Sequence, residues 1–494
     1  MRTLFYQPRE GFVGDVIPYY ENGIYYIFYL HAHRNIDKYG EGTSWYLLTT
    51  KDFIHYEEHG EVLVHGNKEQ QDLNAFTGSV CKKEGIYYLY YTGYNAHEPF
   101  YMGKEPMQAV MLASSTDLVN WEKKEKDILY ASEVHYELSD WRDPYVFYNE
   151  EKKEYWMLLA ARQRLGAKRR RGCVGLCTSK DLDCWEAKEA LYAPGLYMTH
   201  ECPEMFQIGE WWYLIYSSFS ERFATHYRMS KSSSGPFWAP VEDTFDGRGF
   251  YAGRTASEGN RRYLIGWTPT RKDESDYGDY EWAGTLVVHE LVQREDGTLY
   301  AKIPDTVGRV FDKSLPFTFH EITKGFQDWY GGKLQADTAF DAVVSEEELP
   351  VCCKIRVKFH FEKGTRSLGI LLRSDGEAET CYSIRLEPDK NRMVFDMWPR
   401  KIKDAKEDTW EINGDVPYFI ELERYCLLEP YCNYELTILL DDNMGVVYLH
   451  GQTAMSFRTY NLRRGKLGVF VSEGNAEFYD MEIKVKSADD GARI

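Results

Sequence analysis

The chain has 494 residues, 43% of them hydrophobic, and a formal net charge of −19 at pH 7. This length exceeds one ordinary domain, so we expect two domains, and the apolar content predicts packed cores and excludes a disordered chain. The negative charge argues against non-specific nucleic-acid binding, which depends on positive charge.

Residues 1–5 lead into no long apolar region with a small-residue cleavage site, so we expect no signal peptide. No apolar run approaches the length of a membrane span, so we expect no membrane partner. The ten cysteines include no Cys-x-x-Cys pair, which argues against a zinc site. We therefore expect reduced thiols in a cytoplasmic protein that needs neither a metal nor a cofactor.

A turn followed by a run of aromatic and aliphatic residues recurs along the first half of the chain. Such runs are typical of β-strands. The starts of the runs lie about fifty to seventy residues apart. The five copies occupy residues 22–29, 84–91, 153–159, 209–216 and 259–266.

A second segment, Ser/Thr-x-Asp with a closing aromatic residue, follows each of the first three copies. It occupies residues 50–56, 115–121 and 179–185. The Ser/Thr-x-Asp part is typical of a turn, so we expect its acids to be structural. Two segments that recur in the same order indicate a β-propeller, with one blade for each of the five copies. The alternative is a long β-sandwich with accidental internal similarity.

The pattern changes after about residue 312, where the repeated segments stop. Residues 353–359 and 434–440 instead alternate polar and apolar side chains, which is typical of strands in an antiparallel sandwich. We therefore predict an all-β protein with two domains. A five-bladed β-propeller would span residues 1–312, and a β-sandwich would span residues 322–494.

Three acidic residues precede three of the repeated strands at similar distances. Asp15 and Glu201 each lie ten residues before the first aromatic residue of their strand, and Asp143 lies twelve residues before it. The corresponding positions in the second and fifth copies are Thr77 and Gly253, which carry no charge. Because the first strand of a propeller blade lines the central channel, the three carboxylates would converge at one level.

A single acid among the 78 in this chain is usually a solvated surface charge, and Asp-Pro or Glu-x-Pro can simply form turns. Three acids at matching positions favour a site. Clustered carboxylates repel one another, so the pKa of one rises while another stays low. A general acid beside an anionic nucleophile requires this difference. Since two carboxylates across a glycosidic bond perform glycoside hydrolysis, we predict a site that cleaves sugars.

Several short motifs resemble those of glycoside hydrolase family 32, the group of β-fructofuranosidases, levanases and inulinases. Residues 141–144 are similar to its Arg-Asp-Pro motif, and residues 201–206 to its Glu-Cys motif. Residues 76–79 and 91–93 resemble its second-blade motifs, and residues 282–286 the segment that closes its propeller. A five-bladed propeller followed by a β-sandwich is that family's architecture, which agrees with the repeats.

The resemblance implies a role for each acid. Asp15 would be the nucleophile that forms a covalent fructosyl-enzyme. Glu201 would be the general acid and then the base that activates water. Asp143 would hold sugar hydroxyls and stabilise the transition state, while Arg142 would orient Glu201 or bind a hydroxyl. The reaction would proceed with net retention, with the Asp15 and Glu201 carboxyls roughly 5–5.5 Å apart.

Further contacts with the carbohydrate substrate are expected from residues in the family motifs and in the loop after the first repeated strand. These residues are Trp45, Phe76, Ser79, His33, Arg34 and Trp282. The chain departs from the family at Gly14-Asp15-Val16-Ile17-Pro18, where the family has Asn-Asp-Pro-Asn-Gly, and at Leu30, where it has glutamine. These changes surround the reacting sugar and leave its identity open.

A basic cluster lies inside the third repeat, at Arg162, Arg164, Lys168, Arg169, Arg170 and Arg171. It is either a solvated hairpin tip or a clamp for an anionic sugar or a neighbouring subunit, because arginine forks suit phosphate and carboxylate groups.

Three other functions are compatible with the sequence. The first is an inverting arabinofuranosidase or xylosidase of the related family 43, in which the carboxyls stand farther apart. The second is a fructosyl transferase, in which a sugar instead of water meets the covalent intermediate. The third is a carbohydrate-binding protein without catalysis, against which the presence of both Asp15 and Glu201 argues.

Overall fold

The computed structural model of the chain describes all residues except 1–3, 101–104, 125–127, 324–331, 399–419 and 488–494. The described structure is all-β, as predicted, and its helices are single turns. These are α1 (Ile36–Tyr39), α2 (Asp305–Arg309) and the 3-10 turns Lys168–Arg170, Lys272–Glu274 and Pro388–Lys390. No helix among the described residues is long and apolar enough to cross a membrane.

Four antiparallel sheets form from residues 12–302. The first has the order β16 (Tyr251–Glu258), β17 (Arg261–Arg271), β18 (Tyr280–Gln293), β1 (Phe12–Glu21), β2 (Ile24–Ala32), β3 (Trp45–Thr50) and β4 (Tyr56–Leu63), with β19 (Leu299–Lys302) beside β18. The second contains β5 (Asn74–Lys83), β6 (Ile86–Tyr94), β7 (Gln108–Ser115) and β8 (Glu122–Lys123).

The third sheet contains β9 (Tyr136–Asn149), β10 (Glu154–Gln163), β11 (Gly172–Ser179) and β12 (Glu186–Tyr192). The fourth contains β13 (Glu201–Ile208), β14 (Trp211–Ser218) and β15 (Ala224–Ser230). The five repeated segments of the sequence are strands β2, β6, β10, β14 and β17, as predicted.

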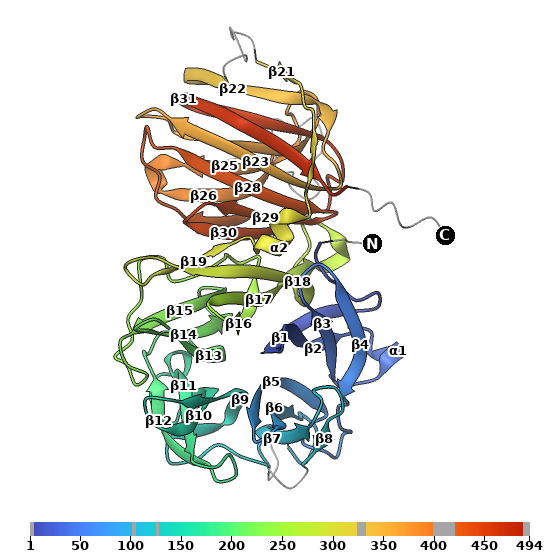
Figure 1. The fold of residues 1–494 in the computed structure, drawn as a ribbon, viewed down its shortest axis with the longest axis vertical. Coiled ribbons are helices and arrows are strands. Elements are labelled where there is room, and N and C mark those ends of the chain that lie inside the picture. The colour runs from blue at the N-terminus through green and yellow to red at the C-terminus, as the bar shows by residue number, and fades with distance from the viewer. Residues whose placement is uncertain (1–3, 101–104, 125–127, 324–331, 399–419, 488–494) are drawn as a thin grey trace.

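The strands that precede the repeated segments contact one another around a common centre. Strand β1 contacts β5 and β16, β5 contacts β9, β9 contacts β13, and β13 contacts β16. Figure 1 shows the four sheets arranged around this centre, below the sheet formed by the rest of the chain. The first and fifth repeats share one sheet because β1 pairs with β18 at Val13 and Gly284.

The Ser/Thr-x-Asp segments are turns, as predicted. In the first, the Thr50 hydroxyl accepts hydrogen bonds from the N–H groups of Asp52 and Phe53, at 3.2 and 3.0 Å. The Asp117 and Asp181 carboxylates likewise accept bonds from backbone N–H groups of their own turns. These acids therefore shape the chain locally and lie outside the central cluster.

The remaining strands form one twelve-stranded sheet. Its order is β27 (Leu422–Tyr425), β26 (Arg392–Trp398), β25 (Cys381–Glu387), β24 (Ser367–Ser374), β31 (Lys466–Val485), β23 (Cys352–Phe361), β28 (Tyr434–Asp441), β29 (Met444–Leu449) and β30 (Thr453–Arg458). Three short or edge strands pair with β31 or with each other: β20 (Lys313–Leu315), β21 (Phe319–Glu321) and β22 (Lys333–Glu348). Buried and partly buried residues alternate along β23, as its sequence predicts, and the buried ones join a separate apolar core.

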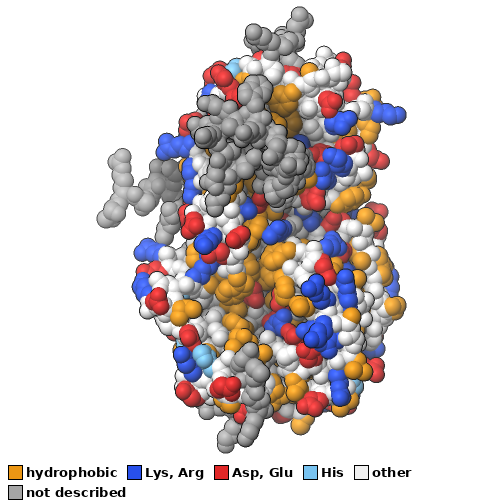
Figure 2. Space-filling view, turned by 180° about the vertical axis from the view of Figure 1, so that it is seen from behind, with side chains coloured by type: hydrophobic (Ala, Val, Ile, Leu, Met, Phe, Trp, Pro, Cys, Tyr) orange, Lys and Arg blue, Asp and Glu red, His pale blue; other side chains and the backbone are white. Residues whose placement is uncertain are grey.

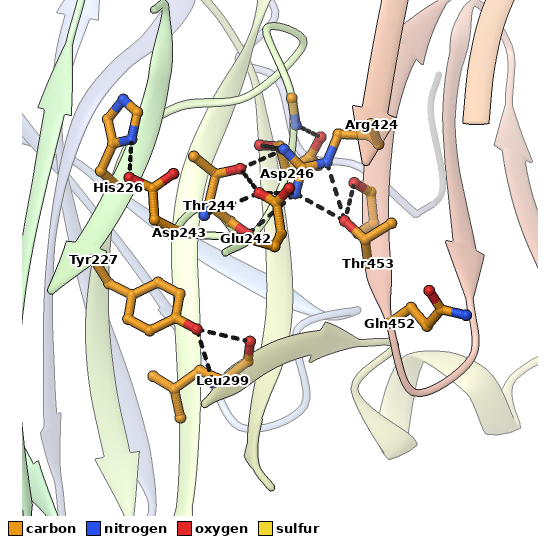
Figure 3. A network of polar contacts seen from close by, with 12 residues as sticks. His226, Tyr227, Glu242, Asp243, Thr244, Asp246, Leu299, Arg424, Gln452 and Thr453 are labelled. Carbon is orange, nitrogen blue, oxygen red and sulfur yellow. Dashed lines mark hydrogen bonds and ion pairs between the residues drawn. The ribbon is translucent and has the colours of Figure 1, made fainter. Parts of the chain in front are cut away.

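A buried polar network joins the twelve-stranded sheet to the first part of the chain (Figure 3). Arg424 on β27 donates to the backbone oxygens of Thr244 and Asp246 and to the hydroxyl of Thr453. The Asp246 carboxylate accepts from the Ser456 backbone N–H and hydroxyl. Because water is excluded there, each of these groups depends on its protein partner.

We predict that Arg424→Met lowers the free energy of unfolding by about 3–5 kcal/mol, because it leaves buried acceptors without a donor. Urea unfolding followed by tryptophan fluorescence measures the change. The matched control is Arg366→Met, since Arg366 pairs with Glu473 on the exposed surface and should contribute no more than about 1 kcal/mol. Equal effects of the two variants would contradict the importance of the buried network.

Candidate active site

Each of the three predicted acids lies where its strand is interrupted by a β-bulge. The pairing of β1 with β2 shifts between Val13 and Val16, which flank Asp15. The pairing of β9 shifts beside Asp143, and that of β13 shifts directly after Glu201. A bulge adds an unpaired residue and redirects the local side chains. The three acids therefore do not follow the regular alternation of side chains between the two faces of their sheets.

The other two central strands have bulges at the same level. The pairing of β5 shifts between Phe76 and Gly78, and that of β16 shifts between Tyr251 and Arg254. These bulges contain Thr77 and Gly253, the positions that correspond to the acids in the sequence repeats. The repeat therefore encodes a bulge in all five copies, and three of the copies place an acid there.

Positive backbone φ angles mark these bulges. Asp143 has φ 58°, Cys202 has φ 49° and Ala252 has φ 52°. Residues other than glycine rarely adopt this region because the Cβ atom is crowded. Such strained conformations concentrate at functional sites, where the surrounding structure holds them in place.

The Asp15 carboxylate has a hydrogen-bond donor on each oxygen. Thr77 Oγ1 donates to Oδ2 at 2.8 Å, and Trp267 Nε1 donates to Oδ1 at 3.0 Å. Burial raises the pKa of Asp15, and the nearby Glu201 charge adds to the rise, while the two hydrogen bonds and Arg254 oppose it. The two donors fix the plane of the carboxylate.

Two donors also hold Glu201. Arg142 Nη2 donates to Oε1 at 2.8 Å, and the Tyr251 hydroxyl donates to Oε2 at 2.6 Å. Arg142 is itself anchored by Asp140, to which its Nη1 donates at 2.5 Å. The Glu201 carboxylate is therefore oriented by residues from two other strands, β9 and β16.

Asp143 lies close to the other two acids. The backbone N–H of Cys202, the neighbour of Glu201, donates to Asp143 Oδ2 at 3.1 Å. The Cys202 thiol lies 4.0 Å from the same oxygen and 3.9 Å from Asp15 Oδ2. The three acids that lie far apart in the sequence are thus brought into one cluster.

Arg254 lies beneath this cluster and is almost completely buried. It donates to the backbone oxygens of Asp143 and Gly78, at 2.6 and 3.0 Å. A positive charge at this place offsets part of the repulsion among the carboxylates.

Burial raises the pKa of Asp143 to about 7. The Glu201 and Asp15 carboxylates also raise this pKa, whereas the Arg142 guanidinium lowers it. Three acids in one cluster, of which Asp143 is buried and the other two are partly buried, cannot all carry a charge without cost. Asp143 is a group that can take up a proton near neutral pH.

Of the predicted substrate contacts, Arg142 bonds Glu201 directly, and the Trp282 ring lies against Gly14, next to Asp15. A Cβ atom on Gly14 would be 2.7 Å from its ring, so the ring covers the residue before Asp15. Its ring also meets that of Trp267, and 44% of its surface is exposed. Phe76 is partly buried on the bulged strand β5, where its ring stacks on that of Tyr94.

Trp45 and Ser79 do not lie where a substrate contact was predicted. Trp45 has no exposed surface, belongs to an apolar core and donates to the backbone oxygen of Ala75. The Ser79 hydroxyl accepts a bond from the Val146 N–H at 2.8 Å and connects β5 to β9. Both side chains face the packing between strands, so the structure gives them a structural role.

His33 and Arg34 lie at the rim, in the loop after β2. His33 is partly buried, and its ring stacks on that of Tyr39. Arg34 donates to Glu281 and to the backbone oxygens of Trp282 and Ala283. Arg34 therefore anchors the segment that carries Trp282.

The basic cluster of the third repeat is partly engaged with acids. Arg162 pairs with Asp140, the acid that anchors Arg142, and Arg171 pairs with Glu137. These two arginines support the framework of the site and are not solvated tips.

Tyr251, Trp267, Arg254 and Thr77 belong to the site, although they were not predicted from the sequence. Thr77 occupies the position equivalent to the acids, but it carries no charge. Tyr251 and Arg254 lie within two residues of the equivalent Gly253, and this proximity in the sequence is the signal that could have indicated them. Trp267 lies on the second strand of its repeat, for which the spacing gives no indication.

No group of three or more His, Cys, Asp or Glu side chains suited to hold a metal ion occurs among the residues that the structure describes. The ten cysteines, all of which lie among the described residues, form no disulfide bonds.

Residues 5–302 match the family model for the glycosyl hydrolases family 32 N-terminal domain. The chain belongs to glycoside hydrolase family 32. The matched region contains the four sheets around the acid cluster, so the family assignment and the geometry concern the same part of the molecule.

Curated relatives of this family-32 protein include two named sucrose-6-phosphate hydrolase. The one from Vibrio alginolyticus is 25% identical over 318 residues, which cover 59% of this chain and 61% of the relative. The one from Escherichia coli is 26% identical over 294 residues, which cover 56% of this chain and 59% of the relative. The chain thus spans about three fifths of the length of the curated relatives it matches.

Solved structures match the family-32 chain over nearly its full length. Fructan 1-exohydrolase IIa from Cichorium intybus has a TM-score of 0.73 at 14% identity, covering 99% of this chain and 97% of that one. Exo-inulinase from Aspergillus awamori has a TM-score of 0.72 at 16% identity, and the match covers 98% of this chain and 97% of that one. At these identities the likeness shows that the fold is shared.

The raised pKa of Asp143 predicts a pH dependence of stability. Between the ordinary carboxyl pKa of about 4 and the folded value of about 7, folding takes up a proton, so this residue's contribution to stability falls as pH rises. Asp143→Asn should therefore gain stability relative to the original protein from pH 5 to pH 7. Urea unfolding at both pH values measures this difference, and a constant difference would contradict the raised pKa.

Proposed function

We propose that this family-32 protein is a retaining glycoside hydrolase that releases terminal β-fructofuranosyl residues from small oligosaccharides or fructans. The observation that carries the proposal is the cluster of Asp15, Asp143 and Glu201 in a chain of this family. Each carboxylate is held by donors from other strands, so the three groups have fixed positions relative to one another. Preorganised groups of this kind are what transition-state stabilisation requires.

In the first step, the Asp15 carboxylate attacks the anomeric carbon of the fructosyl residue. The bond from that carbon to the glycosidic oxygen breaks, and protonated Glu201 gives its proton to the leaving oxygen. The product of this step is a fructosyl ester of Asp15. Thr77 and Trp267 orient the attacking carboxylate, and the Tyr251 and Arg142 donors orient Glu201.

In the second step, the Glu201 carboxylate takes a proton from water. The water oxygen bonds to the anomeric carbon from the opposite side, and the Asp15 carboxylate leaves. Two displacements restore the original configuration. Asp143 does not react in either step, and its carboxylate binds sugar hydroxyls beside the charged transition state.

We infer that the four sheets around the site are a five-bladed β-propeller of residues 1–312 and that residues 322–494 are a β-sandwich domain. The ring of contacts among β1, β5, β9, β13 and β16 supports the propeller. The separate apolar core of the twelve-stranded sheet supports the second domain. We also propose the cytoplasmic location that the scattered cysteines of the sequence led us to expect.

We predict that Asp15→Asn and Glu201→Gln each lower kcat for fructose release from sucrose or a short fructan by at least about 10³-fold, since each removes one of the reacting groups. The assay is fructose release from a panel that also contains aryl arabinofuranosides and xylosides. Asp181→Asn is the matched control, because Asp181 serves a turn away from the site. Release of pentose by the original protein, with no release of fructose, would contradict the proposal.

A further inference from the structure

A cavity of about 550 Å³ lies between the loop after β2 and the start of β5. Trp282, whose ring covers Gly14 next to Asp15, forms part of its wall. Asn74, three residues before Thr77 on β5, forms another part. When a fructosyl residue is bound at Asp15, its leaving group therefore lies next to this cavity. The mechanism described above uses none of the other residues in its wall.

Four aromatic rings form one side of this cavity, which we call the His–Tyr wall: Tyr46, His31, His33 and Tyr39. The ring of His31 lies 4.3 Å from that of Tyr46 and 4.2 Å from that of His33, between ring centroids. The rings of His33 and Tyr39 are stacked at 4.0 Å. Aromatic faces of this kind pack against the C–H faces of sugars and have polar atoms at their edges for hydroxyl groups.

The charged groups of the cavity do not favour an anion. Arg34 is directed away, toward Glu281 and two backbone oxygens, and its guanidinium lies 3.7 Å from the centre of the Phe12 ring. His97 pairs with Glu41 at 2.8 Å. Glu41 and Glu61 also line the cavity and bring negative charge to it. A phosphate site would instead present an arginine fork or lysines to the ligand.

We propose that this cavity binds the leaving sugar of the substrate, and that it selects an uncharged sugar residue over a phosphorylated one. The inference rests on the proposed fructosidase function and specifies its leaving group. It separates this chain from the reaction that the names of its curated relatives describe, in which the sugar carries a phosphate. The departures from the family around Leu30 lead directly into the His–Tyr wall.

The protonation states of His31 and His33 agree with binding of an uncharged sugar. Burial lowers the pKa of His31 to about 4, and burial also lowers the pKa of His33. Both rings are therefore neutral at pH 7 and give no positive charge to a phosphate. Neutral imidazoles still offer one donor and one acceptor each, which suits hydroxyl groups.

The test compares kcat/KM of the full chain for sucrose, sucrose 6-phosphate and methyl β-fructofuranoside, whose leaving group is too small to reach the wall. The original protein should prefer sucrose to sucrose 6-phosphate by at least about tenfold. In Tyr39→Ala, the ratio of kcat/KM for sucrose to that for methyl β-fructofuranoside should fall about tenfold, because the exposed end of the wall is removed.

Two controls accompany Tyr39→Ala. Tyr39→Phe keeps the ring and loses only the hydroxyl that donates to Glu10, so it should keep the sucrose ratio. Tyr148→Ala removes a similarly exposed tyrosine that packs edge-to-face against Tyr155 in the third sheet, and it should also keep the ratio.

A preference for sucrose 6-phosphate, or an unchanged ratio in Tyr39→Ala, would overturn the inference while leaving the proposed function intact. Absence of fructose release from all three substrates by the original protein would overturn the proposed function and the inference with it. The two failures are therefore distinguishable in one set of assays.

Discussion

Mutual repulsion among three closely packed carboxylates, one buried and two partly buried, is the constraint around which the centre of this molecule is built. Asp15, Asp143 and Glu201 are brought together by bulges, and each would be unstable there without donors from other strands. Arg254 adds a buried positive charge that bonds to the backbone of Asp143. The same polar contacts that hold the three acids thus also join the central strands to one another.

The sequence predicted the acids because the repeat carries information on position. Equal spacing from each repeated strand places equivalent residues at one level of the molecule. This spacing alone indicates that Asp15 and Glu201 lie together. The spacing could not identify Tyr251 or Trp267, because their contacts with the acids depend on how separate sheets pack. The same limit explains Trp45, whose indole sits in the packing between strands where motif resemblance predicted a substrate contact.

The surroundings of the acids combine apolar and acidic side chains. Hydrophobic side chains gather over the middle of one face of the four-sheet region, with acidic side chains among them (Figure 2). The His–Tyr wall and its paired charges extend the site from the reacting sugar toward the leaving group. Cleavage of the glycosidic bond would then depend on the acids at the bulges, and selection of the leaving group would depend on the loop after β2. Substitutions in the loop could therefore change substrate specificity without changing the reaction.

The most direct test of the central claim is the configuration of the sugar when it is first released. NMR spectra recorded within the first minutes of sucrose or short-fructan hydrolysis distinguish β-fructofuranose from its α anomer before they equilibrate. A double displacement through Asp15 and Glu201 predicts that the β anomer appears first. Initial release of the α anomer would mean a single displacement by water, and it would contradict a covalent intermediate on Asp15.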